Sequence, residues 1–434
     1  MNKTGILFSI VIVMIAGSVG YAETAEAGAK AVVETADITS KIVYNFWEHA
    51  SPTRGFWGLN DHLGKYGMEF GAAVTTVYQT NVKGGTSTHN HKGRHIGRYD
   101  MELAMDLEKL LGIEGGSFFI HGWGGWPNEE GIDALSVGSA FGTNALAVSN
   151  RSLDIVECFY EGPLLSDNVT MAIGKLDFTG IFDASQYADD ECCQFLNPAL
   201  VDDPTIPFPS HGLGVILNWE ITDSWYLMGG ACDAQADIRE TGFRTAFHKE
   251  DYFFYALETG ITSQLDSDNG PMEGTYRAGL WVDGQNKARF SNGKNYRDDT
   301  GMYLSCDQMM IKENSNSDDS QGLGGFFRFG YANSDLNEIG NFWSFGFQYQ
   351  GLIDGRDDDV AGFGFASGIF SDYSGANDGS GYTENSETAI ELYYSAAVTP
   401  CLIISPSVQY ISDPGGTNAA RDALILGLRA KMTF

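Results

Sequence analysis

Basic side chains are scarce in this chain. Its 434 residues include 26 Lys and Arg against 57 Asp and Glu, a formal net charge of −31. A surface with this charge repels the phosphate backbone, which excludes nucleic-acid binding through phosphate attraction. Long apolar runs are scarce too. The one stretch apolar enough to cross a bilayer lies at the extreme N-terminus, which excludes a helical membrane protein with several spans.

Motifs for catalysis or metal binding are also missing. The sequence contains no EF-hand loop, Gly-rich phosphate cradle, G-x-S-x-G elbow or HExxH motif, and its six cysteines form no CxxC pair. His89, His91 and His95 form an H-x-H-x3-H cluster. Without a nearby carboxylate, this cluster favours a solvated loop over a metal site. We therefore expect no enzyme, no metal and no cofactor. The adjacent Cys192 and Cys193 have no disulfide partner that spacing could assign.

The N-terminus has the features of an export signal. Lys3 precedes the apolar residues 6–15, and Gly20-Tyr21-Ala22 is a small-x-small cleavage site. We predict a signal peptide over residues 1–22; a retained anchor helix is the alternative. Residues 23–50 are Ala-rich with apolar positions at near-helical spacing. They predict a short periplasmic helical segment within residues 23–58, stopped by Pro52.

The rest of the chain alternates between apolar and polar residues. In the last segment Leu426 and Leu428 share one parity, and Gly427, Arg429 and Lys431 take the other. Period two is typical of a strand with one apolar face. About sixteen such segments occur. They centre near Val74, Glu102, Ile120, Val156, Ile173, Ile216, Met228, Leu257, Leu280, Leu304, Phe327, Phe347, Phe365, Leu392, Ile404 and Leu428.

The breaks between these segments alternate between longer and shorter. Long outer loops and short periplasmic turns alternate in this way in transmembrane barrels. A closed barrel also pairs every strand's backbone groups inside the membrane. We therefore predict an all-β fold: a 16-stranded antiparallel transmembrane β-barrel over residues 59–434, an outer-membrane porin, preceded by the short N-terminal helical segment. A soluble β-sandwich or propeller is the alternative, but it explains neither the export signal nor the long–short rhythm.

Several motifs occur in the order found in one known family. They are AIGKLD at 172–177, YQGL at 349–352, GR at 355–356, ELYY at 391–394, PSVQYI at 406–411 and DALILGLR at 422–429, with Phe434 at the end. From about Leu59 onward the chain thus resembles the carbohydrate-selective porins of the OprB family. The resemblance implies a monomeric outer-membrane channel of a diderm bacterium. Its function would be passive, carbohydrate-selective diffusion of mono- or oligosaccharides into the periplasm, with the third outer loop narrowing the pore.

Two other functions stay open. The acidic excess favours a general, cation-preferring diffusion porin. The second alternative is a barrel enzyme or adhesin that uses its outer loops. The third outer loop is about residues 179–211, and its acidic residues and prolines are typical of a constriction loop; an ordinary outer loop is the alternative. The expected partners are small sugars, outer-membrane lipid and, through a terminal aromatic that resembles its recognition signal, the barrel-insertion machinery at Phe434.

Strand parity predicts the pore lining. Charged side chains that face lipid at the midplane cost about 2–4 kcal/mol, so the polar face lines the lumen. Arg and carboxylate groups can exchange hydrogen bonds with sugar hydroxyls, and an indole face can pack on the sugar ring. The predicted pore-lining and substrate-binding residues are Arg98, Glu102, Glu157, Lys175, Asp177, Arg277, Trp281 and Asp283. Arg328 and Glu391 are also predicted to face inward. The alternative role for all of these is ion pairing along a solvated wall.

Overall fold

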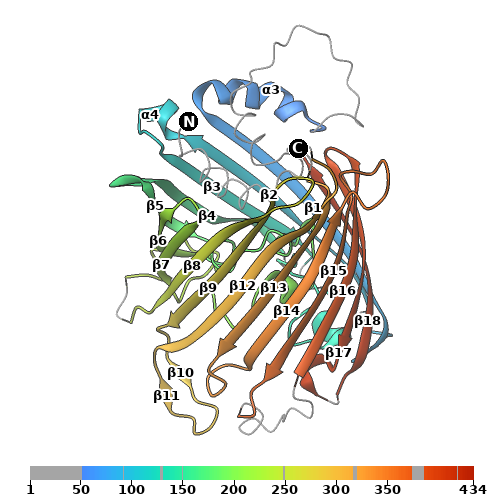
Figure 1. Cartoon of the computed structure of the whole chain (residues 1–434). Coiled ribbons are helices and arrows are strands. Elements are labelled where there is room, and N and C mark those ends of the chain that lie inside the picture. Colours follow the sequence, from blue (N-terminus) through green and yellow to red (C-terminus); the bar gives the residue numbers. More distant parts are fainter. Residues whose placement is uncertain are drawn as a thin grey trace.

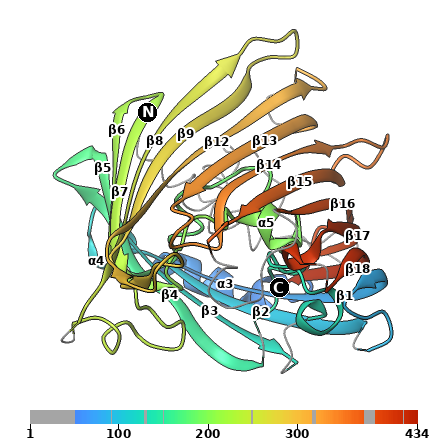
Figure 2. The same cartoon turned by 90° about the horizontal axis from the view of Figure 1, so that it is seen from below.

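The protein folds into a closed antiparallel β-barrel of sixteen strands. A computed structural model describes residues 51–90, 92–127, 131–148, 150–247, 250–315, 320–373, 386–417 and 419–434. Each barrel strand pairs with the next one along the chain, and β18 pairs with β1 to close the ring (Figures 1 and 2). We call the β1–β18 pairing the seam.

The element bounds are as follows. The barrel strands are β1 (Met68–Gly85), β2 (Gly93–Asp106), β3 (Ser117–Trp126), β4 (Arg151–Leu164), β5 (Ser166–Leu176), β6 (Gly212–Thr222), β7 (Trp225–Asp233), β8 (Phe253–Leu265), β9 (Met272–Asp283), β12 (Asp299–Lys312), β13 (Gly322–Ala332), β14 (Ile339–Gln350), β15 (Val360–Phe370), β16 (Ser386–Thr399), β17 (Leu402–Ser412) and β18 (Arg421–Thr433). A small hairpin consists of β10 (Lys287–Ala288) and β11 (Asn295–Tyr296), and the helices are α3 (Arg54–Leu63), η1 (Gly64–Tyr66), α4 (Leu107–Leu111), η2 (Asp133–Val137), α5 (Pro198–Val201) and η3 (Pro414–Gly416).

The predicted strands are confirmed. Each of the sixteen predicted centres lies within one barrel strand, in order. The first outer connection is shorter than the rhythm predicts, because β1 continues to Gly85 and β2 begins at Gly93. The β10–β11 hairpin has no counterpart in the prediction. Its two-residue strands are too short to give an alternating pattern.

The described chain enters the barrel through α3. The predicted signal peptide (1–22) and residues 23–50 of the predicted helical segment lie outside the described residues. A helix follows Pro52, where the sequence predicts that a helix stops. The Thr53 hydroxyl oxygen caps it by accepting a hydrogen bond from the Phe56 N–H at 3.1 Å. The Asn60 amide then pairs with both backbone groups of Phe70 at 2.8 and 3.1 Å, which attaches α3 to β1.

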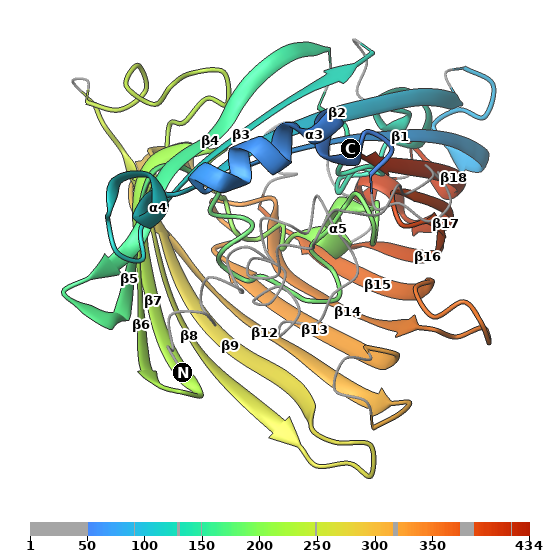
Figure 3. The same cartoon turned by 90° about the horizontal axis from the view of Figure 1, so that it is seen from above.

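The two ends of the barrel differ. The helices α3 and α4 and the C-terminus lie at one end (Figures 1 and 3). The β10–β11 hairpin lies at the other end, where the long connections leave the strands. Long loops mark the outer end of such barrels, so α3 lies on the periplasmic side. No helix among the described residues combines the length and apolar character needed to span a membrane.

The strands have the two faces that parity predicts. On β18, Leu428 is 51% exposed on the outer surface, whereas the adjacent Arg429 is 1% exposed inside. On β14, Trp343 and Phe347 face outward and Ser344 is buried. The apolar surface therefore faces lipid, and the charged side chains lie in the interior.

The interior of the barrel is partly filled by its own loops. Phe195 and Leu200, from the connection between β5 and β6, belong to a buried cluster with the wall residues Phe326, Phe342 and Tyr393. A second cluster packs Phe178 and Phe182 of the same connection with Phe254 and Trp281 of the wall. This connection, residues 177–211, is named L3 below.

Candidate pore constriction

L3 folds into the barrel rather than away from it. The helix α5, which belongs to L3, lies inside the ring of strands in both end views (Figures 2 and 3). The loop has turns of its own. The Asp190 carboxylate accepts the backbone N–H groups of Cys192 and Cys193 at 2.7 and 3.1 Å, and the Asn197 side chain caps α5. The tip of L3, residues 190–194, is therefore a preformed turn.

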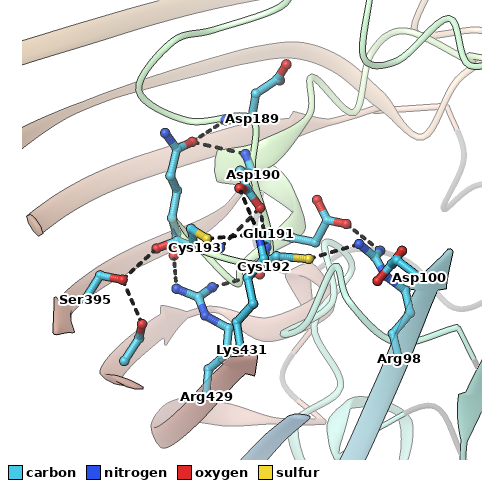
Figure 4. A network of polar contacts seen from close by, with 12 residues as sticks. Arg98, Asp100, Asp189, Asp190, Glu191, Cys192, Cys193, Ser395, Arg429 and Lys431 are labelled. Atoms are coloured by element: carbon cyan, nitrogen blue, oxygen red, sulfur yellow. Dashed lines mark hydrogen bonds and ion pairs between the residues drawn. The ribbon is translucent and has the colours of Figure 1, made fainter. Parts of the chain in front are cut away.

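Wall side chains hold the backbone of L3. Glu391 on β16 accepts the N–H groups of Leu196 and Asn197 at 3.0 and 2.8 Å. Arg429 on β18 donates to the Glu191 and Gln194 carbonyls at 2.7 and 2.8 Å (Figure 4). Because both wall residues are at most 1% exposed, their charges are compensated inside the barrel by these bonds. The path of L3 is thus fixed through main-chain atoms.

Arg98 on β2 holds the tip of L3 from the other side of the seam. Its guanidinium lies 3.1 Å from Asp100 and 2.5 Å from the Glu191 carboxylate, and it donates to the Cys192 sulfur at 2.9 Å (Figure 4). The Lys431 ammonium on β18 lies 3.3 Å from the Cys193 sulfur. The tip therefore bridges β2 and β18 across β1.

The other half of L3 is held by β8, β12 and β13. Arg328 lies 3.3 Å from Asp183 and 3.1 Å from Asp189. Glu258 on β8 accepts the Asp183 N–H at 2.9 Å. The Asp307 carboxylate accepts the Ser185 hydroxyl at 2.6 Å. As predicted, Arg328 and Glu391 face inward, and both serve as loop anchors.

Two further outer loops are hydrogen-bonded to side chains on the inner face of the barrel. In the β3–β4 connection, the Thr143 carbonyl accepts amide hydrogen bonds from Gln79 and Gln409 at 2.8 and 3.0 Å. Glu387 on β16 accepts the Ala140 N–H at 2.8 Å in the same connection. The β7–β8 connection is held by Lys175, described next. The described parts of three loops thus narrow the passage.

The predicted residues on β2, β4 and β5 all lie on the inner side. Arg98 anchors L3 and is 4% exposed, and Glu102 is also buried. Glu157 pairs with the His121 ring at 3.1 Å. Lys175 donates to three backbone carbonyls, those of Ile155, Ile238 and Glu240, at 2.7 to 2.8 Å. Asp177 begins L3 and accepts the Thr179 N–H at 3.0 Å.

The three predicted residues on β9 are held by neighbours as well. Arg277 pairs with Asp307 at 2.7 Å. Trp281 is 1% exposed and belongs to the apolar cluster beneath L3. Asp283 pairs with Lys287 at 3.1 Å. The predicted residues therefore differ in their partners. Arg98 holds the tip of L3, Asp177 begins L3, and Trp281 packs beneath it. Glu157, Arg277 and Asp283 pair with side chains of neighbouring elements.

Trp123 on β3 was missed by sequence reasoning. Its ring lies 4.9 Å from the Arg98 guanidinium and 5.0 Å from the ring of His211 at the end of L3. It is half-buried, and its indole N–H has no hydrogen-bond partner among the described residues. The sequence did contain a signal for it: Trp123 has the same parity as Phe119 and His121, which face inward, and glycines flank it on both sides.

L3 carries the acidic character of the site. Residues 177–211 include seven Asp and Glu and no Lys or Arg. Burial raises the pKa of Asp202 to about 7, and the nearby Glu191 and Asp177 carboxylates act in the same direction, against Arg328. Burial likewise raises the pKa of Cys193 to about 11. Cys193 is therefore a neutral thiol at physiological pH.

Comparison with known proteins identifies the family. The profile described as carbohydrate-selective porin, OprB family, matches residues 90–434. The chain belongs to the OprB family. This makes it an outer-membrane carbohydrate channel of a Gram-negative-type bacterium, and the family is one of channels rather than enzymes. The expectations of family, barrel fold, location and carbohydrate transport are thereby confirmed.

Individual relatives agree with this assignment. The chain is 21% identical over 425 residues to Porin B of Pseudomonas aeruginosa, covering 87% of this chain and 91% of the relative. It is 27% identical over 304 residues to an uncharacterized protein of Aquifex aeolicus, covering 67% and 91%. The high-pH structure of Pseudomonas putida OprB has the same fold, with a TM-score of 0.76, 19% identity, and coverage of 89% of this chain and 99% of that one.

The structure also describes part of the histidine cluster, the cysteines and an acidic turn. The described residues contain no group of three or more His, Cys, Asp or Glu arranged to hold a metal. Of the histidine cluster, His91 lies outside them. All six cysteines are free thiols. At the β14–β15 turn, Asp359 pairs with Arg356 at 2.7 Å and accepts the Ala397 N–H, a structural cap.

Proposed function

We propose that neutral mono- or oligosaccharides diffuse passively through the gap between L3 and the wall formed by β2, β3 and β4. The observation that carries this is Trp123, whose half-buried ring lies between Arg98 and His211. An indole face with adjacent charged hydrogen-bonding groups suits a pyranose ring, whose C–H face is apolar and whose edge is polar. Glu157 and Glu191, with side chains 13% and 20% exposed, supply carboxylates on the two sides.

The predicted residues take different parts in this proposal. Glu157, Asp177 and Glu102 contribute polar groups along the passage, whereas Arg98 and Lys175 hold L3 and the β7–β8 connection and so set its width. The three predicted residues on β9 stabilise another part of the barrel wall: Arg277, Trp281 and Asp283. Sugar contacts stay few, since a transport site must release what it binds.

Sugar-titrated conductance in planar bilayers tests the proposal. We expect glucose or maltose to reduce the conductance of the purified protein, and Trp123→Ala to weaken this block several-fold. Trp343→Ala, which removes an indole from the lipid-facing surface, is the matched control and should leave the block unchanged. Conductance that is indifferent to every sugar tried would overturn the proposal.

The second candidate is a general, cation-preferring porin, favoured by the seven acidic residues of L3. The reversal potential in a salt gradient separates the two functions. Strong cation selectivity without sugar block would favour the general porin.

We also propose that the barrel is a monomer, that residues 1–22 are removed on export, and that the insertion machinery recognises Phe434. The monomer is supported by the β3–β4 connection, whose described part binds its own barrel through Gln79, Gln409 and Glu387. Light scattering in detergent should give the mass of one chain; a trimer mass would contradict it.

A further inference from the structure

The connection between β9 and β12, residues 284–298, forms a second feature at the outer end, named L5 here. It contains the β10–β11 hairpin, in which the Gly293 N–H donates to the Arg289 carbonyl at 2.8 Å. Gly293 has φ of 67°, so this tight turn suits glycine. The hairpin extends beyond the ends of the neighbouring strands (Figure 1). It therefore presents its side chains outside the barrel.

L5 is basic in an acidic protein. It carries Lys287, Arg289, Lys294 and Arg297 against a single Asp298, whereas L3 carries seven acidic residues and no basic ones. One of the four has an internal role. Lys287 pairs with Asp283 and Asp299 at 3.1 and 2.7 Å and fixes the base of the hairpin.

The other three basic residues lie beside two tyrosines, of which Tyr296 is exposed and Tyr252 is half-buried. The Arg289 guanidinium lies 4.4 Å from the ring centre of Tyr296, and that of Arg297 lies 5.2 Å from Tyr252. Arg289 has one carboxylate near it, Asp335 at 3.7 Å. Lys294 and Arg297 are exposed and have no carboxylate within 4.0 Å among the described residues.

This arrangement suits a phosphorylated sugar. A guanidinium stacked on a ring keeps its N–H edge free for bidentate hydrogen bonds to phosphate, and a lysine adds charge. The exposed ring of Tyr296 can pack on sugar C–H groups. The acidic L3 below disfavours the passage of anions, so an anion held at L5 is not on its way through the pore.

Anionic sugars that do not pass through the pore are still available at the outer surface of the membrane, as the headgroups of glycolipids. The register pairs Leu280 with Met302, and both are exposed to lipid on the outside of β9 and β12. Three residues farther along, Asp283 pairs with Asp299, and L5 begins. The hairpin thus starts where the lipid-facing surface ends. We propose that L5 binds the phosphorylated sugar headgroup of the outer-leaflet glycolipid, lipopolysaccharide.

Retention of lipopolysaccharide by the purified protein tests this. The probe is isolated lipopolysaccharide added to the full chain in detergent, with bound phosphate and sugar measured after gel filtration. We expect the double variant Lys294→Gln, Arg297→Gln to bind about tenfold more weakly, with unchanged conductance in bilayers that lack the glycolipid. The matched control is Lys65→Gln, Lys109→Gln, which removes two exposed charges at the periplasmic end and should bind normally.

Three results would overturn the proposal. The first is equal retention by the L5 variant and the unmodified protein. The second is an equal loss in the periplasmic control, which would indicate a general charge effect. The third is displacement of lipopolysaccharide by millimolar glucose 6-phosphate together with its permeation, which would identify L5 as an entry site for soluble sugar phosphates. Sugar block is not a readout here, so the outcome is independent of the proposed function.

Discussion

A charged side chain on the inner wall can anchor a loop or contact sugar, and the sequence does not distinguish these two roles. Arg98 was predicted to contact sugar, and it borders the sugar path that we propose. Its guanidinium is nevertheless committed to Asp100, Glu191 and the Cys192 sulfur. A buried charge with such partners is strongly destabilised when one of them is removed. Anchoring is therefore the first role of Arg98, and any contact with sugar comes second.

Glu391 offers a sharper test of anchoring. Glu391→Gln keeps the size of the side chain but removes the charge that accepts the Leu196 and Asn197 N–H groups. We expect the docking of L3 to weaken by about 1–3 kcal/mol, because hydrogen bonds to a charged acceptor are the stronger kind. Single-channel recordings should then show noisier, less constricted conductance. Glu69→Gln, at an exposed position on β1, should record like the unmodified channel; indistinguishable traces from the Glu391 variant would contradict the anchoring role.

L3 concentrates acidic side chains inside the barrel. Its anchors neutralise part of its acidity: Arg98, Arg328 and Arg429 all bind it from the wall. Burial raises the pKa of Asp202 to about 7, and it also raises the pKa of Asp183 to about 8 and that of Asp203 to about 6. As pH falls from 8 to 6, Asp202 takes up a proton, and the constriction loses at least one negative charge.

Ion selectivity should therefore depend on pH. One charge about 7 Å from a passing ion in water changes its energy by about 0.6 kcal/mol, or about threefold in permeability. We expect the preference for K⁺ over Cl⁻, measured by reversal potential, to fall between pH 8 and 6. Asp202→Asn should have a lower preference at pH 8 and a smaller change in preference between pH 8 and 6. Asp167→Asn, at the exposed periplasmic end of β5, should keep the pH dependence, and a flat profile in the unmodified channel would refute the assignment.

Strands were predictable and loop docking was not. Period-two alternation is local, so every barrel strand could be located, and parity correctly pointed Arg98, Glu157 and Trp281 inward. Parity predicts whether a side chain points inward, but not whether a loop then covers it. Trp281 was expected to line the pore, yet L3 covers it, whereas Trp123 is half-buried beside Arg98. Which inward residue is covered depends on contacts such as Glu391 with Asn197, which join residues far apart in the sequence.

For the whole molecule, the last residue joins the first strand. The Phe434 N–H donates to the Ala72 carbonyl at 2.9 Å, and β18 pairs with β1 from Thr433 to Arg421. Closure therefore involves both ends of the barrel sequence. Phe434 itself is only partly buried, so its packing contributes modestly to stability.

Replacing Phe434 should separate recognition from stability. We expect Phe434→Ser to lower the amount of barrel in the outer membrane several-fold, while purified chains refold in detergent about as well as the unmodified protein. Phe434→Tyr, which keeps the aromatic ring, should restore the yield in cells. A normal membrane yield of the serine variant, measured by heat-modifiable gel mobility, would show that the insertion machinery does not use this residue.

The tip of L3 touches both β2 and β18, strands that become near neighbours only when the ring is complete. A chain stalled before its last strand has paired cannot offer Arg429 and Lys431 to residues 190–194. The narrow passage therefore forms only together with the closed ring, because the contacts that fix the tip of L3 need both β2 and β18 in place.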